Sequence, residues 1–420
     1  MIFDDGLSSK DGHWFEIDRG IARHHVERGA RVTVVAHAGF KDSADLAALG
    51  VRVLPLIEQS SWAGWVPTAT WWDRLARRWP IAAPFREWAG VLEQARHFRA
   101  VLRRLLREDA YDCVLHPTAL MADFVAWCLM PPSLRDRAGR VVFSTWSPIA
   151  TYHDDRPPTF ARKLAFWKLI AWRLRGQFAS GRMLFLTDSV RIGDEYRKAA
   201  NLDPIVVGGP REMGVVGGCA ARHVHGLTFG SLGAARWEKG IDVLQDAIAR
   251  LDQCDPRHDL RFVIQWNRAV LRPDGTVLPR NPMLAASQRV DWREAVLSSF
   301  DYEAALAGID CMVLPYRRLM YQSRSSAVAV EAACAGIPMI YTADTWLADF
   351  VAEQGAGIAV ADGDVAGLAE AIRRMAADYP AYKAQAVERS AIARARNSPA
   401  AFAKVLWHEQ NDVGAAGQPA

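Results

Sequence analysis

Residues 311–341 constrain the fold most strongly, because they predict a strand, a helix and a second strand in direct succession. The apolar run 311–316 has the length of a buried strand. An Ala- and Val-rich stretch of helical length then stops at Gly336, since a residue without a side chain suits the end of a helix. The run 338–341 begins the next strand. Two strands joined through a helix run parallel, so the chain is predicted to form a parallel α/β sheet.

A polar loop carrying Ser323, Arg324, Ser325 and Ser326 precedes this helix. Serine is a favoured N-cap residue, so these hydroxyls are predicted to lie where the helix begins. The first turn of a helix offers free backbone N–H groups and a positive dipole end, which suits a phosphate. Two interpretations stay open: a phosphate-binding loop, or an ordinary crossover whose helix is capped by serine.

The length of 420 residues predicts two domains, because it exceeds the size at which one hydrophobic core usually keeps growing. Strand and helix patterns alternate up to about residue 207 and begin again near residue 227, on either side of a Gly-rich linker at 207–219. The predicted fold class is α/β, with two Rossmann-like, doubly wound parallel sheets in domains 1–207 and 208–396. Ligands are then expected at the carboxyl ends of the strands, in the cleft between the domains.

Composition excludes several classes of protein. A formal net charge of +4 does not indicate nucleic-acid binding, and no nucleic-acid-binding motif is present. The six cysteines show no CxxC or Cys/His spacing, so no zinc site is predicted, and reduced thiols are typical of the cytoplasm. The N-terminus lacks the features of a signal peptide, and no uncharged apolar stretch reaches the length of a membrane span.

A second polar motif occupies residues 230–244, where a strand leads into a Gly-rich turn, then Arg236 and Lys239, and then a helix. Glycines such as Gly233 allow a ligand to approach the backbone closely, and the two cations are suited to clamp a diphosphate. The spacing matches neither the P-loop nor the dinucleotide fingerprint GxGxxG. The alternative is a solvated corner between strand and helix that carries two surface cations.

The C-terminal half resembles the retaining, nucleotide-sugar-dependent glycosyltransferases of family 4, which have the GT-B fold. Residues 233–244 are similar to their Gly…Arg…Glu-Lys-Gly segment, 302–316 to the run before their donor loop, and 324–338 to that loop and its helix. Residues 12–36 are similar, more loosely, to their entry loop and first helix. The resemblance also implies that the terminal helix, residues 397–410, packs back on the first domain.

The resemblance implies a nucleotide diphosphate sugar as co-substrate, with no metal and no cofactor. Arg236 and Lys239 would hold the donor diphosphate and stabilise the leaving nucleotide. Ser325 and Ser326 would cap the phosphate, and Glu331 would bind the ribose hydroxyls. The other candidates are Gly233, Tyr316, Ser323 and Arg324 at the donor, Gly12 and His13 in the entry loop, and His116.

His116 ends a strand of the first domain, where relatives place a histidine against the donor sugar; the alternative is a packed structural histidine. Three positions depart from the family pattern, namely Ser323 for the first glutamate of the donor loop, Ala327 for a glycine, and Ala234 for an arginine. The first departure leaves the identity of the donor sugar open, because that glutamate contacts the sugar in the family.

Two aromatic segments have no counterpart in the resemblance. Residues 160–182 contain several Lys and Arg but no acid, and as a helix they are amphipathic with aromatic side chains. Residues 62–88 are rich in Trp. Both segments are consistent with a lipid-linked acceptor and with contact at the inner face of a membrane. The alternative is a helix packed on the first sheet, with the tryptophans in the core.

The resemblance thus implies a cytoplasmic, metal-independent glycosyltransferase. It would move a hexosyl unit, with retention, to a hydroxyl on a glycan, a lipid-linked saccharide or a small molecule, in the synthesis of cell-envelope polysaccharide or glycolipid. One alternative is a non-catalytic relative that binds nucleotide sugars, which the missing glutamate at position 323 favours. Another is a sugar-nucleotide epimerase or a phosphorylase-like enzyme, but neither the carboxylates of the first nor the pyridoxal-binding lysine of the second can be assigned.

Overall fold

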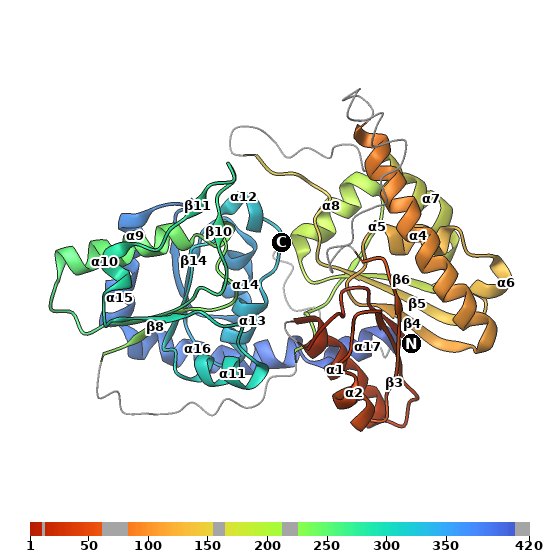
Figure 1. Cartoon of the computed structure of the whole chain (residues 1–420), viewed down its shortest axis with the longest axis horizontal. Coiled ribbons are helices and arrows are strands. Elements are labelled where there is room, and N and C mark those ends of the chain that lie inside the picture. The colour runs from red at the N-terminus through yellow and green to blue at the C-terminus, as the bar shows by residue number, and fades with distance from the viewer. Residues whose placement is uncertain (11–12, 61–82, 154–163, 212–225, 408–420) are drawn as a thin grey trace, which may run out of the picture.

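The computed structural model describes residues 1–10, 13–60, 83–153, 164–211 and 226–407. Figure 1 shows two α/β domains side by side, each with a central sheet covered by helices. The residues before the linker form one domain, and the residues that follow it, apart from the last helix, form the other. Both sheets are parallel, so the predicted α/β fold class is confirmed.

The first sheet has seven strands in the order β3-β2-β1-β4-β5-β6-β7, and all its pairs are parallel. The strands are β1 (Ile2–Phe3), β2 (Thr33–His37), β3 (Arg52–Ile57), β4 (Tyr111–His116), β5 (Ala138–Thr145), β6 (Met183–Thr187) and β7 (Ile205–Val206). The strand order reverses between β1 and β4. In doubly wound sheets ligands bind beyond the carboxyl ends of the strands at such a reversal.

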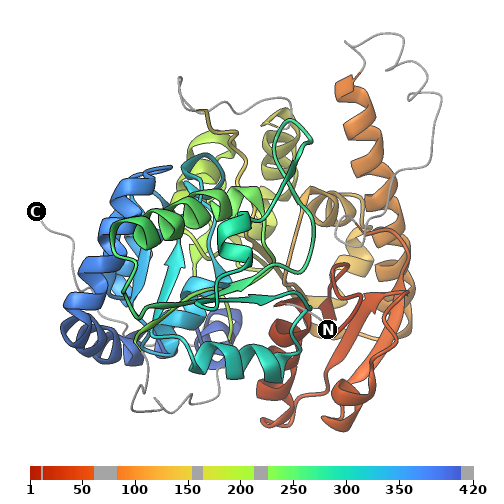
Figure 2. The same cartoon turned by 60° about the vertical axis from the view of Figure 1, so that its left-hand side comes forward.

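Helices cover both faces of this sheet: α1 (His13–Val26), α2 (Ala44–Ala48), α4 (Ala83–Glu108), α5 (Met121–Cys128), α6 (Pro132–Arg135), α7 (Leu164–Ala179) and α8 (Val190–Ala200). Each face of the sheet has its own hydrophobic core, and successive residues of a strand pack in different cores because side chains alternate across the strand. Val35 packs in the core with α4, α5 and α7, whereas Val34 and Ala36 pack in the core with α1. Figure 2 shows the long helix α4 along the outer side of the domain.

The second sheet has six parallel strands in the order β12-β9-β8-β13-β14-β15. They are β8 (Thr228–Ser231), β9 (Arg261–Gln265), β12 (Val290–Arg293), β13 (Cys311–Leu314), β14 (Met339–Thr342) and β15 (Gly357–Val360), with a short hairpin of β10 (Val270–Leu271) and β11 (Val277–Leu278). Its helices are α9 (Ile241–Cys254), α10 (Pro282–Ala285), α11 (Ser299–Ala307), α12 (Arg318–Tyr321), α13 (Ala327–Cys334), α14 (Trp346–Gln354), α15 (Val365–Ala377) and α16 (Tyr379–Arg396).

The chain returns to the first domain through its last helix, α17 (Pro399–Trp407), which lies beside α1 in Figure 1. Phe402 and Leu406 of α17 are buried in the same core as Phe15 and Ile21 of α1. The guanidinium of Arg140 also donates a hydrogen bond to the carbonyl of Leu406. The predicted return of the terminal helix to the first domain is therefore confirmed.

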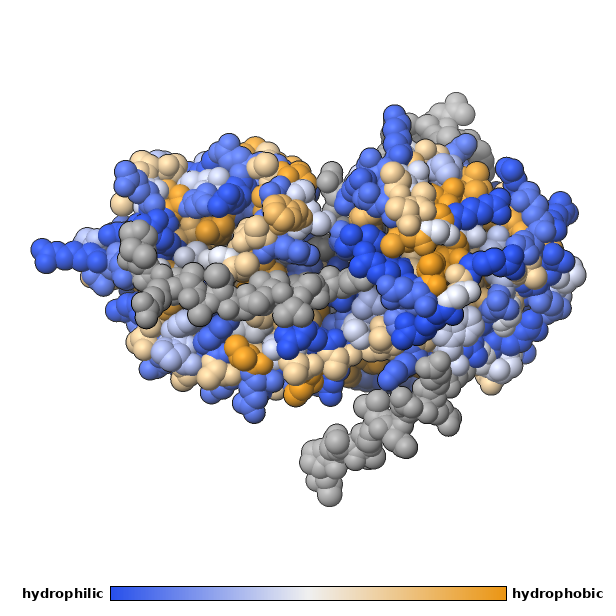
Figure 3. Space-filling model, turned by 90° about the horizontal axis from the view of Figure 1, so that it is seen from below, coloured by the Kyte–Doolittle hydropathy of each residue, from blue (hydrophilic) through white to orange (hydrophobic). Residues whose placement is uncertain are grey.

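The basic segment predicted as a helix at 160–182 contains α7, whose residues Trp167, Ile170 and Leu174 are buried. Trp172 and Leu169 are exposed on the same helix, at 59% and 56%. Residues 61–82, which include most of the Trp-rich segment, lie outside the described residues, and so do residues 212–225, which include most of the linker. Among the described helices, none is both long and apolar enough to cross a membrane. Figure 3 shows two lobes on whose lower face hydrophobic residues are interspersed with hydrophilic ones.

Candidate active site

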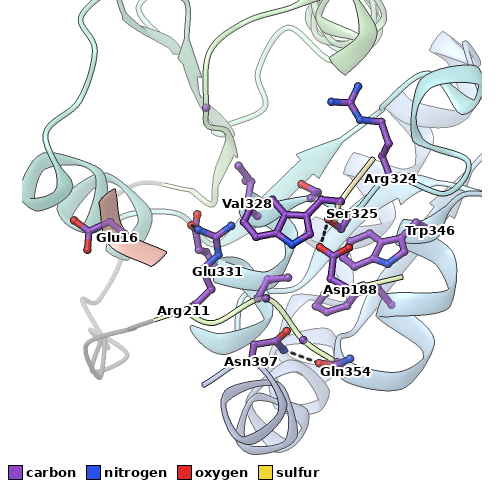
Figure 4. Close-up of a pocket in the computed structure, with 18 of the residues that line it drawn as sticks. Glu16, Asp188, Arg211, Arg324, Ser325, Val328, Glu331, Trp346, Gln354 and Asn397 are labelled. Atoms are coloured by element: carbon purple, nitrogen blue, oxygen red, sulfur yellow. Dashed lines mark hydrogen bonds and ion pairs between the residues drawn. The ribbon is translucent and has the colours of Figure 1, made fainter. Parts of the chain in front are cut away.

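A cavity of about 1570 Å³ lies between the two domains. The first domain contributes loops that follow β4, β5 and β6, with Thr118, Trp146 and Asp188, and the second contributes the loops after β8 and β9 and the start of α13. The carboxyl ends of both sheets therefore face this cavity, as expected for doubly wound domains. Part of the cavity wall is drawn in Figure 4.

The glycine turn after β8 brings Lys239 back against Gly233. Gly233 has a φ of 77°, and its N–H donates a hydrogen bond of 2.7 Å to the side-chain oxygen of Gln265. The short helical turn Trp237–Lys239 ends at Gly240, which has a φ of 66°. A Cβ at position 240 would lie 1.8 Å from the carbonyl oxygen of Pro315. Both backbone conformation and space therefore require glycine at this corner.

Lys239 is buried, and its ammonium lies 5.8 Å from the centre of the Tyr316 ring. Its Nζ donates a long hydrogen bond of 3.5 Å to the carbonyl of Leu232. Burial, followed by the charge of Arg236, lowers the pKa of Lys239 to about 7. A bound anion would raise this pKa, because an opposite charge favours the ammonium form. The lysine is therefore suited to receive a phosphate.

Arg236 lines the cavity beside Lys239 and is partly exposed. Its guanidinium contacts Glu238 at 3.3 Å and donates a hydrogen bond of 3.5 Å to the hydroxyl of Tyr321. These are long contacts, so the guanidinium keeps donors available for a ligand. The two cations of the motif at 230–244 thus reach one wall of the same cavity.

The polar loop 323–326, called the donor loop after the family segment that it resembles, and helix α13 form the adjoining wall. Ser326 is the N-cap of α13, and its Oγ accepts a hydrogen bond of 3.3 Å from the N–H of Ala329. Ser325, one residue earlier, donates a hydrogen bond to the carboxylate of Asp188 in the first domain. Arg324 packs its guanidinium over the ring of Tyr321, at 5.7 Å. The positive end of α13 therefore points into the cavity together with two hydroxyl groups.

Glu331 lies in the middle of α13, beyond the N-cap Ser326, and its residue is 7% exposed. Its Oε2 accepts a hydrogen bond of 2.5 Å from the hydroxyl of Tyr302, and its Oε1 lies 4.0 Å from a guanidinium nitrogen of Arg211. Burial raises the pKa of Glu331, while Arg211, Tyr302 and Lys239 oppose that rise. A buried carboxylate with such partners is a strong acceptor for hydroxyl groups. Figure 4 shows Arg211 and Glu331 side by side.

Three of the candidate residues do not line the cavity: Ser323, Tyr316 and His116. Ser323 and Tyr316 are each 1% exposed, and Tyr316 packs its ring against that of Tyr321 with centres 4.4 Å apart. Gly12 lies outside the described residues, and His13 is the first residue of α1. In the same helix Trp14 and Glu16 do reach the cavity.

His116 is held within the first domain by both ring nitrogens. The indole N–H of Trp127 donates a hydrogen bond of 2.9 Å to Nε2, so the ring proton belongs on Nδ1. That Nδ1 donates a hydrogen bond of 2.8 Å to Asp123. The ring is 1% exposed and stacks against Phe143 at 5.2 Å. This environment matches the alternative interpretation, a structural histidine, and does not place the ring against a donor sugar.

Contacts between the domains come from first-domain residues that the sequence does not single out. Arg191 forms an ion pair with Asp349 at 2.6 Å and donates a hydrogen bond of 3.0 Å to the carbonyl of Gln322, just before the donor loop. At another edge of the cavity Ser299 donates a hydrogen bond of 2.7 Å to Glu16. The donor loop is therefore held against the first domain. Among the described residues, no group of three or more metal-binding side chains is present.

The arrangement of two parallel-sheet domains around this cavity is the GT-B fold of glycosyltransferases. A sucrose-phosphate synthase from Thermosynechococcus elongatus superposes with a TM-score of 0.64 at 15% identity, over 97% of each chain. HepE from Anabaena, solved with UDP and glucose, gives 0.60 at 15% identity over 97% of this chain and 98% of HepE. A glycosyltransferase from Rickettsia africae gives 0.62 at 11% identity over 97% and 99%.

Residues 225–378 match the family model described as glycosyl transferases group 1. The matched stretch contains the glycine turn, the donor loop and Glu331. No curated protein matches the chain. Together the fold and this match support glycosyl transfer as the class of reaction.

Proposed function

We propose that this protein transfers a hexosyl unit from a nucleotide diphosphate sugar to a hydroxyl group, with retention of anomeric configuration. The observation that carries the proposal is the convergence of Arg236, Lys239, Ser326 and Glu331 on one cavity between two domains. Two cations and the positive end of a helix suit a diphosphate, and a buried carboxylate beside them suits a ribose. HepE, which shares the fold, has been solved with UDP and glucose.

The leaving group is a nucleoside diphosphate, which gains negative charge as its bond to the sugar breaks. Lys239 and Arg236, together with the N–H groups at the start of α13, would stabilise that charge. The lysine would regain its full positive charge when the diphosphate binds, since its pKa is lowered to about 7 without a ligand. These cations perform the neutralisation that a metal ion provides in other phosphoryl and glycosyl transferases, so the proposed reaction is metal-independent.

The acceptor is proposed to enter from the first domain. Trp14 and Trp146 line the cavity there, with ring centres 5.7 Å apart. Flat indole rings pack well against the apolar faces of sugars. The acceptor class is therefore a glycan, a lipid-linked saccharide or a small molecule with a comparable ring. The attacking hydroxyl would approach on the face from which the phosphate leaves.

Contact with a membrane surface is part of the proposal. The exposed Trp172 and Leu169 of α7 lie among Lys168, Arg173 and Arg175 on the same helix. Apolar side chains surrounded by cations favour the surface of an anionic bilayer. A cytoplasmic enzyme attached there would act in the synthesis of cell-envelope polysaccharide or glycolipid.

The first experiment incubates the protein with a panel of nucleotide sugars and measures slow hydrolysis of the donor, in buffer with and without EDTA. We expect one donor to be hydrolysed at the same rate in both buffers. Tight binding without any hydrolysis or transfer would instead favour the non-catalytic alternative, which the position of Ser323 outside the cavity keeps open. Interconversion of the sugar without release of nucleotide would identify an epimerase. If no nucleotide sugar binds, the proposed donor site is wrong.

A further inference from the structure

One hydrogen bond links the proposed phosphate site to a carboxylate of the first domain. Asp188 follows β6, and its Oδ2 accepts the hydroxyl proton of Ser325 in the donor loop. The dashed line in Figure 4 marks this contact, which crosses between the domains. A serine hydroxyl has a single proton to donate. Ser325 therefore cannot donate to Asp188 and to a phosphate at the same time.

A diphosphate that takes the Ser325 proton would leave Asp188 facing an anion. Both groups would then lie within hydrogen-bond distance of one hydroxyl, so their oxygens would be at most about 5.5 Å apart. The other carboxyl oxygen of Asp188, Oδ1, is buried and has no hydrogen-bond partner among the described residues. Two acidic groups this close cannot both stay ionised without cost, and one of them takes up a proton.

The charged groups around Asp188 do little to relieve this repulsion. Arg211 of the linker is the cation that acts on its carboxylate. The Arg324 guanidinium of the donor loop points away from Asp188 in Figure 4. Two ion pairs lie on helices that contribute to the same cavity: Arg191 of α8 pairs with Asp349 of α14, and Glu353 of α14 pairs with Arg396 of α16. On α8, Arg197 pairs with Asp194, and Glu195 accepts a hydrogen bond from Tyr152.

Even without a ligand the carboxyl group holds its proton more tightly than usual. Burial raises the pKa of Asp188 to about 6, although the Ser325 hydrogen bond, the backbone N–H of Asp188 itself and Arg211 all oppose the rise. A diphosphate that takes the Ser325 hydrogen bond removes the opposition of that bond to the rise in pKa, and it adds a like charge beside Asp188. Both changes act in the same direction.

We propose that Asp188 binds the donor diphosphate as a carboxylic acid, donating a hydrogen bond from its own proton to a phosphate oxygen. The inference rests on the proposed function and assigns to that site a first-domain residue. The proton comes from solvent when the donor binds, and no bond to carbon is made or broken in this step. The same hydrogen bond would strengthen as charge develops on the leaving diphosphate, so Asp188 is a catalytic residue.

The test measures how many protons the protein takes up when a nucleotide sugar binds. UDP-glucose, ADP-glucose and GDP-mannose are suitable probes, because their diphosphates are esterified at both ends and do not titrate near neutral pH. Binding is measured by calorimetry in several buffers of different ionisation enthalpy, and the dependence of the observed heat on that enthalpy gives the proton number. Lys239, whose pKa is about 7, also takes up a proton. The decisive quantity is therefore the difference between variants.

We expect the isosteric variant Asp188→Asn to take up close to one proton fewer than the wild type at about pH 8, where Asp188 is ionised without ligand. The affinity of the wild type should fall with rising pH about tenfold more per pH unit than the affinity of Asp188→Asn, because the variant takes up one proton fewer on binding. Asp188→Ser should behave in the same way and guards against a folding defect in one variant. Glu353→Gln removes another carboxylate that lines the cavity, already paired with Arg396, and should keep the wild-type proton number.

Equal proton numbers for the wild type and both Asp188 variants would overturn the inference while leaving the proposed donor site intact. If Glu353→Gln also takes up about one proton fewer than the wild type, the effect belongs to the cavity as a whole and not to Asp188. Absence of binding for every nucleotide sugar contradicts the proposed function itself, and this inference with it. The two failures are thus distinguished by whether a probe binds at all.

Discussion

The ammonium nitrogen of Lys239 lies 2.5 Å from the point that a Cβ on Gly233 would occupy. The position of the lysine thus depends on the absence of a side chain at residue 233. We expect Gly233→Ala to displace Lys239 and to weaken nucleotide-sugar binding at least tenfold, about 1.4 kcal/mol. Because Gly233 has a φ of 77°, the same change should also lower the free energy of unfolding by about 1–2 kcal/mol. Calorimetry and urea unfolding measure the two effects.

Gly275→Ala is the matched control. Gly275 has a φ of 84°, and a Cβ there would meet nothing within 4 Å. This variant should lose a similar amount of stability but bind the nucleotide sugar as the wild type does. Similar losses of affinity in the two variants would mean that backbone strain, and not the contact with Lys239, explains the effect at Gly233.

Replacing Lys239 by methionine should make the protein without ligand more stable and the enzyme inactive. Burial lowers the pKa of Lys239 to about 7, whereas the unfolded chain keeps a pKa of about 10.4, so the unfolded state binds more protons between these values. The wild type therefore gains stability as pH rises from about 7 towards 10, by up to about 1.4 kcal/mol per unit from this group. Lys239→Met lacks this dependence.

Urea unfolding at several pH values checks this prediction. The stability advantage of Lys239→Met over the wild type should be largest near pH 7 and shrink towards pH 10. A methionine variant that is less stable than the wild type throughout this range would contradict the lowered pKa. Donor hydrolysis should be absent from the variant at every pH.

The parts of the site that sequence reasoning could predict are those carried by short contiguous segments. A strand, a polar loop and a helix fix one another locally. The sequence therefore places Arg236 and Lys239 in a turn after a strand, Ser326 at a helix start and Glu331 within that helix, although it could not show that all four line one cavity. Figure 1 shows that both predicted series of strands do form sheets. Ser323 lies only two residues before Ser325, yet its side chain is turned into the core.

First-domain partners such as Asp188, Arg191 and Glu16 could not be predicted, because they reach the donor loop only through the pairing of two domains. Nothing in the sequence around Asp188 distinguishes it from any acid after a strand. Arg211 did carry a signal, as the one basic residue in the Gly-rich stretch 207–219. Helix α5 is buried from residue 121 to residue 127, so it lacks the polar face whose periodicity identifies a helix.

Glu331→Gln should remove the ability of the site to recognise ribose hydroxyls. The carboxylate of Glu331 is buried beside Tyr302 and Arg211, and a hydrogen bond from a ligand to such a charged acceptor is worth about 1.5–3 kcal/mol. The wild type should therefore bind a nucleoside diphosphate more tightly than its 2′-deoxy or 3′-deoxy analogue, and this preference should disappear in the variant. Competition for the nucleotide sugar measures each affinity.

Tyr302→Phe is the control for this prediction. It removes the hydrogen bond to Glu331 but leaves the carboxylate in place, so the preference for ribose should persist even if overall affinity changes. A Glu331→Gln variant that still discriminates against both deoxy analogues would show that the ribose is bound elsewhere in the cavity.

Replacing His116 by phenylalanine should cost stability and spare catalysis. The substitution leaves the indole N–H of Trp127 unpaired in the core and removes one hydrogen bond from Asp123, whose other oxygen still accepts the N–H of Leu120. Such buried losses cost about 1–3 kcal/mol each. Trp127→Phe should restore part of that stability in the double variant, because it removes the unpaired donor. Donor hydrolysis per folded molecule should stay within about threefold of the wild type. A fully stable but inactive His116→Phe protein would instead establish a catalytic histidine.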